Sequence, residues 1–93
     1  MNEPIESTTL AQSYSGPHES IYDGQVVTVI GTVTYVGPDP YGLPGIEFGD
    51  AKNRVLFVVD DFGGLEVGDS ASITGHCEGF TRGMVVMKHC QIN

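Results

Sequence analysis

Two histidine-cysteine pairs come closest to a metal site in this sequence. His76 precedes Cys77, and His89 precedes Cys90. Imidazole nitrogens and thiolates are the ligands that zinc prefers, and four such groups would complete a structural site. Both pairs fall in segments that we predict to be strands, where neighbouring side chains point to opposite faces. We therefore expect no metal ion, and instead buried cysteines beside surface histidines.

The same two cysteines could in principle form a disulfide. A hairpin centred near residues 80 and 81 would place Cys77 opposite about Met84, and Cys90 opposite about Ala71. The two thiols would then lie beyond the Cα separation of about 7 Å that a disulfide tolerates. We expect free thiols, which suit a reducing compartment.

Motifs for catalysis are absent from the sequence. It contains no glycine-rich phosphate loop, no H-E-x-x-H, no C-x-x-C, and no serine or cysteine nucleophile motif with an evident base. We therefore predict that the protein is not an enzyme and has no catalytic residue and no cofactor.

The composition limits both the size of the fold and the class of partner. The 93 residues suffice for one domain with one modest core. Twelve acidic against four basic side chains give a net charge of −8, which disfavours nucleic acid because its binding depends on neutralising phosphates. The first residues combine neither a basic start nor an apolar run, so we expect no signal peptide, no membrane attachment and a cytoplasmic location.

The stretch from Val26 to Val36, V-V-T-V-I-G-T-V-T-Y-V, must organise the fold. Its β-branched residues follow no helical period and predict one long strand. Gly31 lies at its middle, where glycine suits a bend or bulge. A strand bent there pairs with one neighbour through its first half and with another through its second, as in a closed barrel. Gly31→Ala should therefore destabilise the protein, and Gly49, in a predicted exposed turn, offers a comparison.

Four more strands are expected after this one. A stiff, exposed loop spans residues 37–45, because its prolines exclude helix and interior strand. The strands are predicted at residues 46–48, 54–60, 70–77 and 84–92, with hairpin loops at 49–53 and 78–83. We expect Leu65 and Val67, before the fourth strand, to plug the barrel.

The alternation of apolar residues predicts the core. In the last strand, a bulge at Lys88-His89 would bring Cys90 and Ile92 to the same side as Val85 and Met87. The complete predicted core is Val27, Val29, Val33, Ile46, Phe48, Val55, Phe57, Val59, Leu65, Ile73, Val85 and Ile92.

This order of elements predicts an all-β fold, a five-stranded OB-fold barrel with a short or absent helix between strands 3 and 4. The barrel domain is expected over residues 21–93, after a polar tail over residues 1–20. A short helical turn in the tail, capped by Thr8 or Thr9, would lay Leu10 and Tyr14 across an open end of the barrel.

Three segments also carry a family resemblance. They are Y-x-G-x-V-V-x-V-x-G-x-V from Tyr22, L-x-V-G-D-x-x-x-I-x-G-x-C-x-G from Leu65, and V-V-x-x-x-C-x-I from Val85. This pattern resembles the tRNA-anticodon-binding-like OB-fold domains of bacterial putative lipoproteins, over about residues 20–93. The matched positions are barrel-forming apolar residues and turn glycines, and the chain lacks the lipoprotein leader and the long amino-terminal helix. The resemblance implies the OB fold and no particular activity.

OB folds usually bind ligands on the face of their second and third strands, between the first-second and fourth-fifth loops. The candidate ligand-binding residues on that face are Tyr41, Glu47, Arg54, Leu56, Val58, Phe80 and Arg82. The third strand is apolar on both sides, so Leu56 and Val58 must be covered or lie exposed for a partner.

We therefore expect a small acidic binding module that recognises a protein partner, with self-association through the same face as a variant of this function. One alternative is single-stranded nucleic acid, because aromatic rings and arginine stack on bases, although acidic residues crowd this edge: Asp39, Glu47, Asp50 and Glu78. A second alternative is an inhibitor of the phage type that mimics nucleic acid. It would need a continuous acidic face made by Asp60, Asp61, Glu66 and Asp69.

Overall fold

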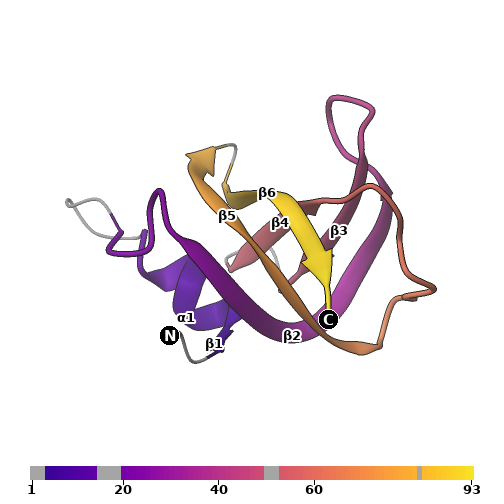
Figure 1. Cartoon of the computed structure of the whole chain (residues 1–93), viewed down its shortest axis with the longest axis horizontal. Coiled ribbons are helices and arrows are strands. Elements are labelled where there is room, and N and C mark those ends of the chain that lie inside the picture. The colour runs from indigo at the N-terminus through magenta and orange to yellow at the C-terminus, as the bar shows by residue number, and fades with distance from the viewer. Residues whose placement is uncertain (1–3, 15–19, 50–52, 82) are drawn as a thin grey trace.

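One long strand, β2 (Val26–Pro38), organises the structure. The computed structural model describes residues 4–14, 20–49, 53–81 and 83–93. In it, β2 pairs through residues 26–32 with β5 (Ser70–Thr81) and through residues 33–38 with β3 (Pro44–Phe48). Figure 1 shows β2 curving under the molecule between these two neighbours. The prediction of a single strand shared by two neighbours is confirmed.

The remaining strands close the barrel. β4 (Arg54–Val58) is antiparallel to β3, and β6 (Met84–Ile92) is parallel to β4 and antiparallel to β5. Since β5 also pairs with β2, the order β2-β3-β4-β6-β5 returns to its starting strand. A two-residue strand, β1 (Ile5–Glu6), adds to β2 in parallel. The all-β, five-stranded barrel is therefore confirmed, and the segment between β4 and β5 has turns in place of a helix.

The irregularity of β2 lies beyond Gly31. Gly31 pairs regularly with Ala71, and the register shifts only between Val33 and Tyr35. Of the bend or bulge predicted at Gly31, the bulge is wrong: it lies about three residues later in β2. A bulge forms where the strand must pass from one partner to the next, and β2 changes partner after Thr32.

The predicted bulge of the last strand is confirmed. His76 pairs with Lys88 and Thr74 with Gln91, so that β6 carries one extra residue at this point. His89 takes a φ of 54° there, a conformation in which non-glycine residues are uncommon. As a result, Cys90 and Ile92 pack against the same core as Val85 and Met87.

Two predicted loops are shorter in the structure. Gly37 pairs with Gly45 and Pro38 with Pro44, so the loop after β2 comprises residues 39–43. The two prolines fit because they occupy the last residue of one strand and the first of the next. The second loop shortens because β5 continues to Thr81 and not only to Cys77. Conversely, β4 ends at Val58, two residues before the predicted end.

Twelve residues were expected in the core, and all of them lie there. Ten are buried, while Leu65 and Ile92 are partly buried and pack against the others. Val67 was expected to plug the barrel, but it is 66% exposed. The adjacent Gly68 donates its N–H to the Val33 carbonyl, and this bond holds the chain at the edge of β2, where Val67 faces outward.

The amino-terminal segment adds to the core through a short helix, α1 (Ser7–Gln12). Leu10 is fully buried and Ala11 nearly so, and α1 packs against β2, β4 and β6. The helix begins after Glu6 and has no side-chain cap, so the predicted caps Thr8 and Thr9 are wrong. Their hydroxyls fall inside the helix because β1 leads directly into it. No helix among the described residues is long and apolar enough to cross a membrane.

Candidate functional site

A groove of about 520 Å³ opens on the outside of the barrel. Its floor is formed by Leu56 and Val58 of β4 with Val86 of β6. One wall is the loop of residues 39–43, and the other is the end of β5, residues 78–81. Both walls rise from the same side of the barrel in Figure 1. This surface, called the groove below, overlaps the face where OB folds usually bind ligands, since it shares β4 and the loop after β2 with that face, but its floor contains β6 in place of β3.

The floor exists because β4 is apolar on both sides. Val55 and Phe57 point into the barrel and are fully buried, so Leu56 and Val58, which alternate with them along the strand, point outward. Leu56 is nevertheless only 2% exposed. Gly45 on the neighbouring strand lies against it, since a Cβ on Gly45 would approach Leu56 Cδ1 to 3.0 Å. The second apolar face of β4 is thus covered at Leu56, and Val58 remains half-buried.

Asp39 shapes the first wall. Its Oδ1 accepts hydrogen bonds from the backbone N–H groups of Tyr41 and Leu43, each at 2.8 Å. Its own N–H donates to the Leu43 carbonyl at 2.7 Å. An aspartate that bonds backbone groups just ahead of it is a recognised turn signal, so the D-P-Y-G sequence could have assigned Asp39 this role. The result is a closed loop that presents Tyr41 and Leu43 outward.

Contacts with Tyr14 of the amino-terminal segment hold the second wall, the end of β5, in place. Phe80 stacks on Tyr14, with 5.8 Å between ring centroids and 22° between ring planes. The Tyr14 hydroxyl donates to Asp23 Oδ1 at 3.0 Å and, because it has one hydrogen, accepts from the Cys77 thiol at 2.8 Å. Burial and these two bonds raise the pKa of Tyr14, so its hydroxyl stays protonated. The amino-terminal segment therefore fixes one wall of the groove.

Apolar groups gather at the rim. Tyr41, Leu43 and Phe80 are 65%, 47% and 48% exposed. The described residues include five other exposed large apolar side chains, and none of them lines the groove: Ile21, Val26, Ile30, Tyr35 and Val67. Clustered apolar exposure is a stronger sign of an interaction surface than scattered exposure.

The seven predicted site residues are not all brought together. Tyr41, Leu56, Val58 and Phe80 line the groove. Glu47 and Arg54 lie in an adjoining, more open depression that also contains Tyr35. Arg82 lies outside the described residues.

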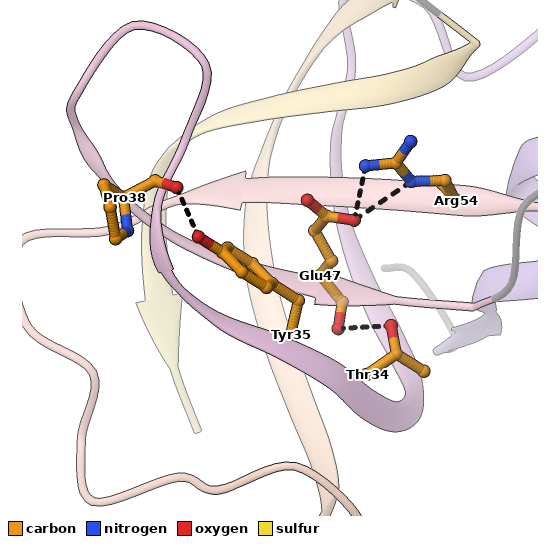
Figure 2. A network of polar contacts seen from close by, with 5 residues as sticks. All are labelled: Thr34, Tyr35, Pro38, Glu47 and Arg54. Atoms are coloured by element: carbon orange, nitrogen blue, oxygen red, sulfur yellow. Dashed lines mark hydrogen bonds and ion pairs between the residues drawn. The ribbon is translucent and has the colours of Figure 1, made fainter.

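Glu47 and Arg54 satisfy each other in that depression, as Figure 2 shows. Arg54 Nε and one terminal nitrogen donate to Glu47 Oε1 at 3.0 and 2.8 Å. The Glu47 side chain is only 11% exposed, so the carboxylate depends on this partner. The Arg54 guanidinium, which we expected to face a ligand, is therefore already bound to the Glu47 carboxylate. The pair therefore counts as part of the barrel wall.

Seven lining residues were not among the predicted site residues: Asp39, Leu43, Glu78, Gly79, Thr81, Val86 and Lys88. Val86 pairs with Leu56 across β4 and β6, and this parallel pairing could not be deduced from the hairpins alone. We expected the proline-rich loop to border the binding face, but its sequence did not single out Leu43 as a site residue.

The His-Cys pairs do not converge. Cys77 is fully buried, whereas His76 points outward and bonds to Glu78 through Nδ1. Within the described parts of the chain, no group of three or more His, Cys, Asp or Glu side chains is arranged to hold a metal. Both cysteines are free thiols, and Cys77 pairs with Met87, not with Met84 as predicted.

Both thiols should react slowly in the folded protein. Burial raises the pKa of Cys77, and burial raises the pKa of Cys90 from 9.0 to about 12. Since the thiolate is the nucleophile, this shift lowers the reactive fraction of Cys90 at pH 8 by roughly a thousandfold. We expect iodoacetamide to modify both cysteines much more slowly in native buffer than in denaturant, as mass spectrometry would measure. Rapid native labelling would contradict the burial of Cys77 and the partial burial of Cys90.

The same shifts give a pH dependence of stability. The folded state holds the thiol protons more tightly than the unfolded state, so their contribution is complete below about pH 9. It should be lost as the pH rises toward 12, and Cys90→Ala should flatten this decline in denaturant melts.

Compared with protein-family models and with curated proteins, the sequence matches none. The structure is a small five-stranded mixed β-barrel, consistent with an OB-fold-like domain.

Proposed function

We propose that this protein is a small acidic binding module that recognises a protein partner through the groove. The observation that carries the proposal is the groove itself, which combines an apolar floor with an apolar rim and overlaps the usual ligand face of OB folds at β4 and the loop after β2. The relation to anticodon-binding-like domains remains a prediction from the sequence, and the proposed function does not depend on it.

The charge of the groove favours a protein over nucleic acid as its ligand, and its fixed walls favour binding of either. Lys88 is the one cation among its described lining residues, while Asp39 and Glu78 carry negative charge. A phosphate backbone would meet net repulsion there. The walls are also fixed in advance, by Asp39 on one side and by Tyr14 on the other. A preformed surface loses less conformational entropy on binding.

A capture experiment tests the proposal. Immobilised protein would be incubated with lysate of its native host, and the retained proteins would be quantified for the parent, for a Tyr41→Ala/Leu43→Ala variant, and for Val67→Ala. Val67 is as exposed as Tyr41 and lies outside the groove. We expect a partner that the groove variant loses and the control keeps. Equal retention by all three proteins would refute the groove as the binding surface.

Single-stranded nucleic acid is the second candidate, because Tyr41 and Phe80 offer rings on which bases could stack. We expect single-stranded DNA or RNA to bind no tighter than high micromolar at about 150 mM salt, since so few cations face the groove. Fluorescence anisotropy with labelled oligonucleotides would measure this. A nanomolar, salt-sensitive complex that Tyr41→Ala abolishes would reverse the ranking.

The nucleic-acid mimic has less support. Asp60, Asp61, Glu66 and Asp69 are all exposed between β4 and β5. However, Asp61 accepts the Gly63 N–H and Asp69 accepts the Glu66 N–H. Two of the four carboxylates thus stabilise turns, which explains their presence without a partner.

A further inference from the structure

We infer that the groove takes a short peptide segment in which an apolar side chain stands close to an arginine or lysine. This inference rests on the proposed function and adds the chemistry of the partner. The inference follows from the charged side chains that line the groove beside its apolar residues.

Each wall of the groove carries one carboxylate. Asp39 belongs to the loop wall and Glu78 to the β5 wall. The ion pairs among the described residues are Arg54 with Glu47 and His76 with Glu78. Asp39 is buried and its Oδ1 already accepts two backbone N–H groups, so the groove carboxylate left for a ligand is that of Glu78. The described partner of Glu78 is the His76 imidazole, and no lysine or arginine of the described chain neutralises it, although Lys88 lines the same groove.

The aromatic rim suits the same ligand. Tyr41 and Phe80 stand on opposite walls, with the apolar floor of Leu56, Val58 and Val86 between them. A guanidinium or ammonium group is attracted to the face of an aromatic ring, while its aliphatic stem packs on apolar surface. A cationic residue can thus contact the Glu78 carboxylate and an aromatic ring together, and a neighbouring apolar residue fills the floor.

The net charge of the whole chain also favours a cationic partner. At −8, the molecule attracts cationic segments and repels acidic ones. Such complementarity mainly sets which partners are accepted and how fast they associate.

A selection from random peptides tests the inference. A phage library of random 12-residue peptides would be selected on the parent protein and depleted on the Tyr41→Ala/Leu43→Ala variant. We expect the enriched sequences to combine an aromatic or aliphatic residue with arginine or lysine. A consensus without basic residues would overturn the inference and leave the proposed function standing. Failure of any sequence to enrich in a groove-dependent manner would count against both.

Two matched variants then test whether the preference for a basic residue comes from the groove. Glu78→Gln removes a groove carboxylate, and Glu66→Gln removes an exposed carboxylate outside the groove. Both change the net charge equally. With a synthetic enriched peptide in calorimetry, we expect Glu78→Gln to weaken binding roughly two- to fivefold, as for exposed charge pairs, and Glu66→Gln to weaken it less. Equal losses would show that net charge alone acts, and would overturn the assignment to the groove.

Two further outcomes would replace the peptide by another occupant. A concentration-dependent dimer in analytical ultracentrifugation, abolished by the Tyr41→Ala/Leu43→Ala variant, would show that a second copy fills the groove. Single-stranded oligonucleotides that displace the enriched peptide would show that the groove prefers bases. Either result would overturn the inference.

Discussion

Gly31→Ala should lower the free energy of unfolding by about 1–3 kcal/mol, the usual range for overpacking a core. A Cβ on Gly31 would lie 2.8 Å from Ser7 Oγ and 2.9 Å from Phe48 Cδ2. The Phe48 ring has little room to retreat, because it is fully buried and packs on Phe57 with 4.6 Å between ring centroids. Alanine would normally stabilise a strand relative to glycine by about 0.5–1 kcal/mol, so the expected sign is opposite to the intrinsic preference.

Denaturant melts of the parent, Gly31→Ala, Phe48→Leu and the double variant would test this expectation. If the ring contact causes the loss, Gly31→Ala should be less harmful in a Phe48→Leu background than in the parent. Gly49 is unsuitable as a comparison, because a Cβ there would meet the Asn53 carbonyl oxygen at 1.9 Å. Gly64→Ala is the better one, since no atom lies within 4 Å of its Cβ position and only its φ of +75° opposes alanine. A Gly31→Ala protein as stable as its parent would contradict the packing of β2 against Ser7 and Phe48.

Leu10→Ala should destabilise the protein by about 2–5 kcal/mol, as for other large-to-small changes in a core. Leu10 is fully buried although it lies on a six-residue helix. A helix this short has little stability of its own, so its burial must come from docking on the barrel. The loss of the side chain would leave a cavity among the strands that α1 contacts.

Thr8→Ala provides the matched control for Leu10→Ala, because Thr8 is exposed on the same helix. Thermal melts should place this variant within about 0.5 kcal/mol of the parent. If Leu10→Ala were equally mild, the amino-terminal segment would not be docked, and Tyr14 could not brace Phe80.

Much of the barrel was predictable because β-branched residues and strand periodicity are local signals. The long strand from Val26 and the bulge before Cys90 both follow from which side chains must face the core. The register of the last hairpin was wrong for a local reason as well. Gly79, taken as part of a loop, lies in an irregularity of β5 at a φ of +131°, and the turn occurs at Gly83. A glycine in a strand can mark a bulge as readily as a turn.

The site was predictable only in part, because its residues meet through the closed barrel. Leu56 and Val58 were found from the two-sided apolar pattern of one strand. The pairing of Arg54 with Glu47 could not be read from the sequence, since it depends on side chains reaching across two strands. The support of Phe80 by Tyr14 joins residues far apart in the chain, and it was likewise not foreseen.

Site-specific photocrosslinking tests the role of the groove most directly. A benzophenone amino acid would replace Tyr41 in one protein and Val67 in another, since both positions are exposed and only Tyr41 lines the groove. After irradiation in lysate of the native host, we predict a crosslinked protein partner from position 41 and none from position 67. The same crosslink from both positions, or from position 67 alone, would contradict the proposal that the groove binds the partner.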